Sequence, residues 1–445
     1  MARSRRRRFG SYRKRVRRFR ARAVAILILF GAVLACVALD PFEQTTKNTA
    51  RRPAKSKPSN TTDSAPRNIA LDTKNPAIDV LLTALDGEPE FTFSAPSGWI
   101  ITNEKNDEIA RTSSSASATL GVSPAGGYLL RGGIVDAESL TISSIANDPI
   151  KVANQSYRGK ITIRKKERGL SVINTVPLEE YLGSVVGSEM YASTTPLSAL
   201  EAQAVIARTY ARWAIEDCGR RPIPDSVEAQ AYLGVGRETA LTRKAVENTQ
   251  NLVLTWNGRL LPAFYHSTCG GSTIDGTVLL GSPAPPPLRG GPCGYCEGGK
   301  LYRWNISIKT KSLAEICGSL GIPGTCRAVD PAGPAGDKWS KLKLRTQAGE
   351  IVTSARTFRN AILKNVKGLM IPSPFIHDVA ASPDGIRVTG RGFGHGVGLC
   401  QIGAAEMSRR SYNTNTILQH YYPSAELGQA PEKRLVASFD NKIGR

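Results

Sequence analysis

Two common nucleotide-binding patterns are absent from this 445-residue sequence. No glycine spacing follows G-x-G-x-x-G and no Gly-rich loop closes on Lys-Ser or Lys-Thr, so neither a dinucleotide site nor a P-loop is predicted. An even spread of charge is also lacking. The net charge is +22, yet residues 1–22 hold twelve basic residues and no acidic one, which leaves +10 for the rest. Because the excess sits at one end, the overall charge does not indicate a nucleic-acid partner.

An uncharged apolar run follows the basic head directly and covers residues 23–39. Its length is at the short end of what spans a bilayer, and positive flanks stay on the cytoplasmic side. We therefore expect a single-pass signal anchor that places the remainder outside the cytoplasmic membrane, in the periplasm or cell wall. A cleaved signal peptide, or lipidation at Cys36, remains an alternative.

Residues 40–75 are rich in Thr, Ser, Asn, Pro and Lys and show no apolar periodicity. Such a composition cannot bury enough apolar surface to fold, so this stretch is predicted to be a disordered linker. Residues 431–445 are predicted to be a tail. The folded part should then be a single domain over residues 76–430.

Short runs of β-branched residues alternate with turn residues from 77 to 163, which predicts a β-rich entry to the domain. Helical periodicity follows, and an Asn257-Gly258 pair between two apolar runs predicts a β-hairpin. We therefore expect an α+β fold with a few central helices.

Two helices are predicted within residues 176–214. Pro177 suits a first turn, and apolar residues then recur at three- and four-residue steps. If the register continues, Glu189 lies on the apolar stripe, and burial would raise the pKa of its carboxyl group. The second helix carries a stripe of small residues, with Gln203 and Tyr210 beside it, so each of these polar groups needs a partner at the helix contact.

Four side chains have the spacing of a metal site: His266, Cys269, Cys293 and Cys296. Two chelating pairs of this kind fit tetrahedral Zn²⁺, and a site closed by four protein ligands would be structural. A disulfide between Cys293 and Cys296 is the alternative. Cys317 and Cys326 flank a turn and could also pair in an oxidising compartment.

Several stretches resemble the SpoIID (stage II sporulation protein D) family of peptidoglycan enzymes. They are LEEYLGSVVGSEM with ALEAQAVIARTY, the Q-x-Y-x-G turn at Gln230, the run HSTCGGST, and GFGHGVGLCQIGA near the C-terminus. In the last run Cys400 stands where Ser is usual. The alternating glycines there predict a strand with one face free of side chains. The resemblance implies that His395 projects toward the cleft.

The resemblance implies a lytic transglycosylase that cleaves peptidoglycan glycan strands, with Glu189 as the single catalytic acid/base. The substrate-binding residues that it implies are Gln203, Arg208, Tyr210, Gln230, Tyr232, Ser267, His395 and Gln401. One carboxyl group suffices when no second carboxylate acts as nucleophile.

Two other functions remain open at this point. The same domain occurs in amidase enhancers, so the chain could bind glycan and activate another cell-wall hydrolase without chemistry of its own. A zinc hydrolase is the second, although it would need an open coordination position. The expected partners are peptidoglycan strands, the membrane and other wall hydrolases.

Overall fold

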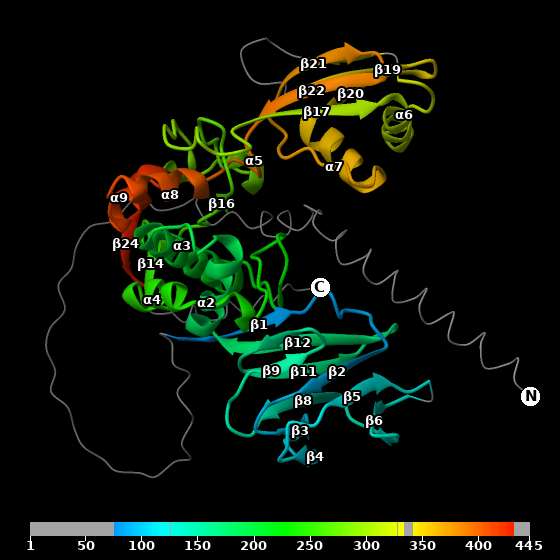
Figure 1. The fold of residues 1–445 in the computed structure, drawn as a ribbon, viewed down its shortest axis with the longest axis vertical. Helices are drawn as coiled ribbons and strands as arrows, with labels where there is room; N and C mark the ends of the chain where they lie inside the picture. The colour runs from blue at the N-terminus through cyan, green and yellow to red at the C-terminus, as the bar shows by residue number, and fades with distance from the viewer. Residues whose placement is uncertain (1–74, 125, 327, 333–340, 431–445) are drawn as a thin grey trace, which may run out of the picture.

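The computed structural model describes residues 75–124, 126–326, 328–332 and 341–430. The predicted basic head, the 23–39 anchor, the linker up to residue 74 and the tail lie outside these ranges. Within them, no helix has both the length and the hydropathy to cross a bilayer. The fold is mixed α+β with extensive sheets and few helices, and three regions follow one another along its long axis (Figure 1).

The first region consists of two sheets. The seven-stranded sheet, ordered β13-β1-β12-β11-β8-β3-β4, contains β1 (Ala77–Leu81), β3 (Trp99–Asn103), β4 (Glu108–Thr112), β8 (Ser139–Ser144), β11 (Lys160–Lys165), β12 (Leu170–Pro177) and β13 (Ile223–Pro224). The six-stranded sheet, ordered β10-β9-β2-β5-β6-β7, contains β2 (Glu90–Ser94), β5 (Ala118–Val122), β6 (Tyr128–Leu130), β7 (Gly133–Val135), β9 (Ile150–Val152) and β10 (Gln155–Tyr157).

Alternating apolar residues hold the two sheets together, as the predicted β-rich entry requires. Phe91 and Phe93 on β2 are buried, as are Trp99 and Ile101 on β3. The rings of Phe93 and Trp99 meet edge to face across the two sheets, with centroids 5.0 Å apart. Every second side chain of a strand faces the same side, so this alternation buries one face of each sheet.

The second region is helical and lies beside the sheets. Its helices are α2 (Leu178–Glu189), α3 (Leu197–Glu216), η2 (Val235–Arg237), α4 (Ala240–Asn248), α5 (Thr277–Leu280), η3 (Pro286–Leu288), α8 (Gln401–Arg409) and α9 (Thr414–Tyr421). Its strands are β14 (Leu252–Trp256), β15 (Arg259–Leu260), β16 (Tyr265–His266), β23 (Leu399–Cys400) and β24 (Glu426–Gln429). The predicted hairpin is confirmed, because β14 and β15 pair around Asn257 and Gly258, which both have positive φ.

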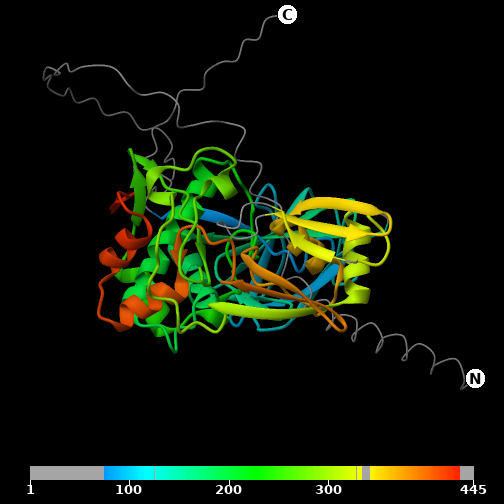
Figure 2. The ribbon, with the colours of Figure 1, turned by 90° about the horizontal axis from the view of Figure 1, so that it is seen from above.

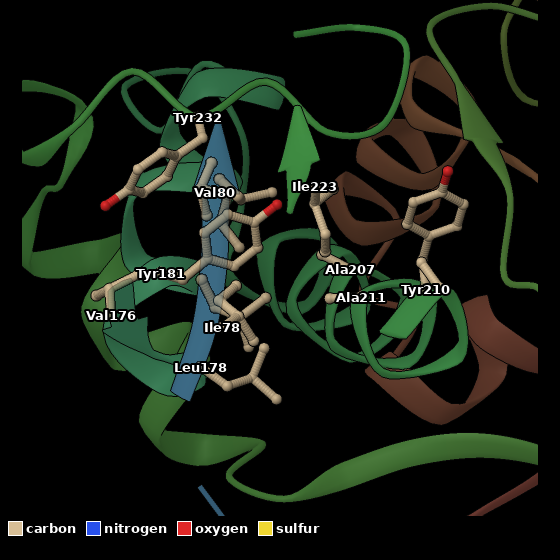
Figure 3. Packing of buried hydrophobic residues seen from close by; sticks show 14 of the residues in the cluster. Ile78, Val80, Val176, Leu178, Tyr181, Ala207, Tyr210, Ala211, Ile223 and Tyr232 are labelled. Carbon is tan, nitrogen blue, oxygen red and sulfur yellow. The ribbon is translucent and has the colours of Figure 1, made fainter. Parts of the chain in front are cut away.

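Helix α2 begins where β12 ends, so its apolar stripe is placed directly on the first sheet. Leu178 lies beside Ile78 of β1, and Tyr181 belongs to the same buried cluster as Ile223 and as Ala207 and Ala211 of α3 (Figure 3). The small residues predicted on α3 permit this close approach. The core of the first region therefore continues without a break into the helices.

The third region has a hydrophobic core of its own, and we call it the 303–391 module. It contains β17 (Arg303–Lys309), α6 (Thr310–Ser319), β18 (Ala328–Pro331), β19 (Lys341–Thr346), β20 (Gly349–Ser354), α7 (Ala355–Asn365), β21 (Ile376–Ser382) and β22 (Gly385–Arg391). Its strands form two three-stranded sheets, β17-β22-β21 and β18-β19-β20. The view from above shows it beside the helical region (Figure 2). The predicted single domain over residues 76–430 thus contains a module with a core of its own.

Candidate active site

Glu189 is the last residue of α2, on the apolar face that the periodicity predicted. Its Oε1 accepts a hydrogen bond from the backbone N–H of Ala231 at 2.7 Å and another from the hydroxyl of Tyr265 at 3.1 Å. The carboxyl group is therefore held in one orientation by two donors from different segments.

Burial raises the pKa of Glu189, and the bonds from Ala231, Tyr265 and Gln401 oppose that rise without cancelling it. The C-terminal end of α2 acts in the same direction as burial, because its unpaired carbonyl groups carry partial negative charge. A carboxyl group with a raised pKa keeps its proton to higher pH than an exposed one and can then donate it. The predicted direction of the shift is confirmed.

A hydrogen-bonded chain of polar side chains surrounds this carboxyl group. Gln230 donates to the hydroxyl of Tyr265 at 3.3 Å and accepts from the hydroxyl of Tyr181 at 3.1 Å. On the other side Gln401, the first residue of α8, donates to Gln203 at 3.3 Å. The segments that the resemblance singled out thus converge on Glu189.

Tyr265 was not singled out from the sequence. It occupies β16, which pairs in parallel with β23, and this pairing brings Tyr265 and Gln401 to the same carboxyl group. The signal available in the sequence was its position next to His266 at the end of a predicted strand.

His395 lies near this site in a half-buried position. Its Nδ1 accepts the backbone N–H of Val397 at 3.1 Å, and its ring centroid is 5.5 Å from that of His266. Burial and the neighbouring His266 lower the pKa of His395 to about 3. The imidazole is therefore neutral at physiological pH and does not serve as a cationic acid.

The glycine segment around His395 is not the strand that its alternation predicted. Strand β22 ends at Arg391, and residues 392–398 form a loop with positive φ at every second position. At Gly398 φ is +68°, and a Cβ would lie 1.9 Å from the carbonyl oxygen of Phe264. The glycines permit left-handed turns and close backbone approach, so the pattern was real but the predicted extended conformation was wrong.

Most of the predicted substrate-binding residues are buried and do not face solvent. Arg208 is 1% exposed, donates to both carboxylate oxygens of Glu179 at 2.7 and 2.6 Å, and also donates to the carbonyl of Leu252. This guanidinium joins α2, α3 and β14, so the prediction that it contacts substrate is replaced by a role in holding the helices.

Tyr232, Tyr210, Gln203 and Gln230 are buried as well. The Tyr232 hydroxyl donates to Asn174 at 2.7 Å, and Tyr210 packs its ring 6.0 Å from that of Phe264. Gln203 and Gln230 belong to the chain around Glu189. In this conformation none of the four is placed for direct contact with a ligand, and their role is to position neighbouring groups. Ser267 and His395 are half-buried, whereas Gln401 is buried like the other four.

The thiol groups of Cys269, Cys293, Cys296 and Cys400 form a cluster, which we call the thiol cluster. Their sulfur atoms lie within 4.8 Å of one another, all four residues are buried, and all are free thiols. Tetrahedral Zn²⁺ with bonds of about 2.3 Å would separate its sulfur ligands by about 3.8 Å, so the cluster has the size of a ZnS₄ site.

Cys400 replaces His266 in the predicted ligand set. The Nδ1 of His266 lies 3.1 Å from the carbonyl oxygen of Val397, and its imidazole is not part of the cluster. The Cys400 sulfur accepts the backbone N–H groups of Cys269 and Gly403 at 3.3 and 3.4 Å and caps α8. Burial and the neighbouring thiols raise the pKa of Cys400, and these backbone donors at a helix N-terminus act against that rise.

A buried guanidinium adjoins the thiol cluster. Arg391 is 2% exposed and donates through Nη1 to the carbonyls of Cys269 and Ser272, whereas its Nε and Nη2 have no hydrogen-bond partner. An unpaired buried cation is costly unless negative charge lies close by. Thiolates in the cluster would supply that charge. Cys317 and Cys326, for which the sequence left a disulfide open, are both free thiols.

Comparison with known proteins finds a family that matches part of the chain. The family model described as "Stage II sporulation protein" (SpoIID) matches residues 166–256, which run from β12 to β14 and include Glu189. The chain therefore contains a segment, residues 166–256, that matches the SpoIID family.

Three relatives show how far the similarity extends. The stage II sporulation protein D of Bacillus subtilis is 28% identical over 314 residues, which cover 66% of this chain and 82% of the relative. An uncharacterized protein of Brachyspira hyodysenteriae is 26% identical over 276 residues, or 61% and 72% of the two chains. The amidase enhancer of B. subtilis is 26% identical over 291 residues, or 55% and 40%.

Proposed function

We propose that the chain is an exported cell-wall enzyme that cleaves peptidoglycan glycan strands by lytic transglycosylation. The observation that carries this proposal is the carboxyl group of Glu189, held by Ala231 and Tyr265 and raised in pKa by burial. The match of residues 166–256 to the SpoIID family model supports a role at the cell wall.

The reaction needs one group that both gives and takes a proton. Protonated Glu189 donates its proton to the glycosidic oxygen as the bond to C1 of the muramyl residue breaks. The resulting carboxylate then removes the proton from the C6 hydroxyl, which attacks C1 and closes a 1,6-anhydro ring. No water is consumed, and Glu189 ends in its starting protonation state.

The surroundings of Glu189 suit a single-carboxyl mechanism. Among the described residues no second carboxyl group hydrogen-bonds to Glu189 or shifts its pKa. A retaining glycosidase of the usual kind needs a second carboxylate about 5 Å away as nucleophile. The neutral, half-buried His395 is suited to contact hydroxyl or acetamido groups of the sugar.

The test uses purified protein, glycan strands freed of stem peptides, and mass spectrometry of the products. The proposal predicts 1,6-anhydro-muramyl ends from the wild type and intact strands from Glu189→Gln. Reducing muramyl ends would indicate a hydrolase instead.

A non-catalytic role is the second candidate, and the similarity to an amidase enhancer favours it. In that case the chain would bind glycan and increase the activity of an amidase. It predicts intact strands with both the wild type and Glu189→Gln, together with faster cleavage by an added amidase.

We further propose that the thiol cluster binds one structural Zn²⁺. Cys269, Cys293, Cys296 and Cys400 would supply all four ligands, which leaves no open position for a hydrolytic water. The metal would tie the segment around Cys293 and Cys296 to β16 and to the start of α8, and so to the segments that carry Tyr265 and Gln401.

Location outside the cytoplasmic membrane is also a proposal. It rests on residues 1–39, where a basic block precedes an apolar run. Membrane fractionation of cells that express the full chain tests it, and a soluble cytoplasmic protein would contradict it.

A further inference from the structure

A hollow of about 560 Å³ lies on the 303–391 module and is lined by Arg303, Trp304, Asn305, His377, Thr389 and Gly390. Strands β17, β22 and β21 lie side by side and supply all of these residues (Figure 1). Asn305 pairs with Thr389 and Trp304 with Gly390, and an irregularity between Ile376 and Asp378 turns His377 outward. The volume is that of a small-molecule site.

Arg303 is an exposed cation that the protein already holds in place. Its Nη1 donates to the carbonyls of Gly270 and Tyr302 at 2.8 and 3.0 Å, and its guanidinium stacks 4.2 Å from the ring centroid of Tyr302. Within the described ranges no acidic residue forms an ion pair with it. The Nε and Nη2 edge therefore keeps its donors in a fixed plane, which is the geometry that binds a carboxylate with two hydrogen bonds.

The other polar groups of the hollow add neutral hydrogen-bonding capacity. In the described part of the chain no hydrogen bond involves the amide of Asn305 or the hydroxyl of Thr389. None of the six lining residues is acidic. A cation without a counter-ion beside unused amide and hydroxyl groups is complementary to an anion that also carries hydroxyl or amide groups.

One wall of the hollow is apolar and rigid. The indole N–H of Trp304 donates to the carbonyl of Gly392 at 3.0 Å, which fixes the ring. A Cβ at position 390 would lie 2.1 Å from Cζ2 of Trp304, so the glycine there makes room for the indole. Trp304 is only 6% exposed and belongs to the core of the module, so the indole stiffens this wall but presents little surface to a ligand.

We propose that this hollow binds a carboxylate-bearing unit of the wall polymer, with the Nε and Nη2 edge of Arg303 on the carboxylate and Asn305 and Thr389 on neighbouring groups. That the ligand carries a carboxylate is inferred from the residues that line the hollow. That the ligand belongs to the cell wall rests on the proposed function. Strand β22 ends four residues before His395. The hollow thus lies on the segment that leads to the Glu189 site, and it extends the substrate-binding surface onto the module.

The carboxylate has two sources in the wall, the lactyl group of muramic acid and the stem peptide. The experiment measures binding to the full chain by calorimetry with N-acetylmuramic acid, its methyl ester and the dipeptide L-Ala-D-Glu. Arg303→Gln is expected to raise Kd for the acid ligand about tenfold, the effect of losing one charge-assisted pair. Arg303→Lys keeps the positive charge but cannot make two parallel hydrogen bonds to a carboxylate. Its Kd should lie between those of the wild type and Arg303→Gln.

Two further variants control for folding and for bulk charge. Thr389→Val keeps the shape of the strand and removes only the hydroxyl, so it should weaken binding several-fold without changing the melting temperature. Lys309→Gln removes one exposed charge from the other end of β17 and should leave Kd unchanged.

Each result has a defined reading. Binding of N-acetylmuramic acid but not its ester identifies the sugar carboxylate, and binding of the dipeptide alone identifies the stem. Equal binding of acid and ester, no binding of any probe, or equal loss with Lys309→Gln and Arg303→Gln would overturn the proposal. Glu189→Gln should bind the acid ligand with the same Kd as the wild type. If the wild type showed no lytic activity but bound the ligand, the proposed reaction would fail and the proposed carboxylate site would stand.

Discussion

The hydroxyl of Tyr265 donates a hydrogen bond of 3.1 Å to Oε1 of Glu189, and the same hydroxyl lies 3.3 Å from Nε2 of Gln230. Gln230 thus fixes the position of the Tyr265 hydroxyl, and that hydroxyl stabilises the carboxylate form of Glu189. It links the end of α2 to β16, two elements that are far apart in the sequence.

Tyr265→Phe is expected to raise the pKa of Glu189 further. The Tyr265 hydroxyl donates to the Glu189 carboxylate and stabilises it, so removal of that donor disfavours the charged form of Glu189. The rise in pKa that burial causes is then opposed by fewer hydrogen bonds. Because the first step needs the protonated acid, the alkaline limb of the pH–rate profile should move to higher pH. Initial rates of product formation across a pH series measure this. Tyr412→Phe, a change at an exposed tyrosine, should leave the profile in place, and an unmoved limb in Tyr265→Phe would contradict the assignment.

Glu189→Gln should stabilise the fold at neutral pH. Burial raises the folded-state pKa of Glu189 above its ordinary value of 4.5, so protonation favours the folded state. That contribution is fully present below about pH 4.5 and is lost as pH rises through the higher folded-state pKa. The melting temperature of Glu189→Gln should therefore exceed that of the wild type at pH 7.5, and the difference should shrink near pH 4. A variant that melts lower at both pH values would indicate that the carboxylate is structural.

Arg208→Met should destabilise the protein by about 3–5 kcal/mol, because it leaves Glu179 buried without its cation. Chemical denaturation measures the loss. The double change Arg208→Met with Glu179→Gln should recover part of it. If Arg208 bound substrate instead, the single variant would raise KM and leave stability nearly unchanged.

Cys400→Ser should abolish metal binding, whereas His266→Gln should retain it. The wild type is expected to hold about one Zn²⁺ per chain, since the thiol cluster offers four sulfur ligands and excludes the imidazole. Metal analysis of the purified variants distinguishes the two ligand sets. Zinc retained in Cys400→Ser and lost in His266→Gln would restore the set expected from spacing.

Local periodicity was sufficient to predict the elements around the site. The stripe that ends at Glu189, the small residues of α3 and the Asn257-Gly258 hairpin all take the predicted form, because each depends on a few neighbouring residues. The placement of Gln401 beside Glu189 followed from a resemblance and could not be derived from spacing.

Features that depend on distant contacts were missed or wrong. Cys400 joins the thiol cluster because β16 pairs with β23, a contact across more than a hundred residues. Arg208 is an ion-pair partner because Glu179 faces it from another helix. Alternating glycines fit both a strand and a left-handed loop, and only the packing against Phe264 selects the loop.

The most direct test of the central claim is the mass of the new muramyl end after digestion of glycan strands in heavy-oxygen water. If Glu189 acts as acid and base without a water nucleophile, the new ends are lighter than reducing ends by one water and carry no heavy oxygen, and Glu189→Gln yields no new ends. Heavy oxygen at the new ends, or undiminished cleavage by Glu189→Gln, would contradict the account.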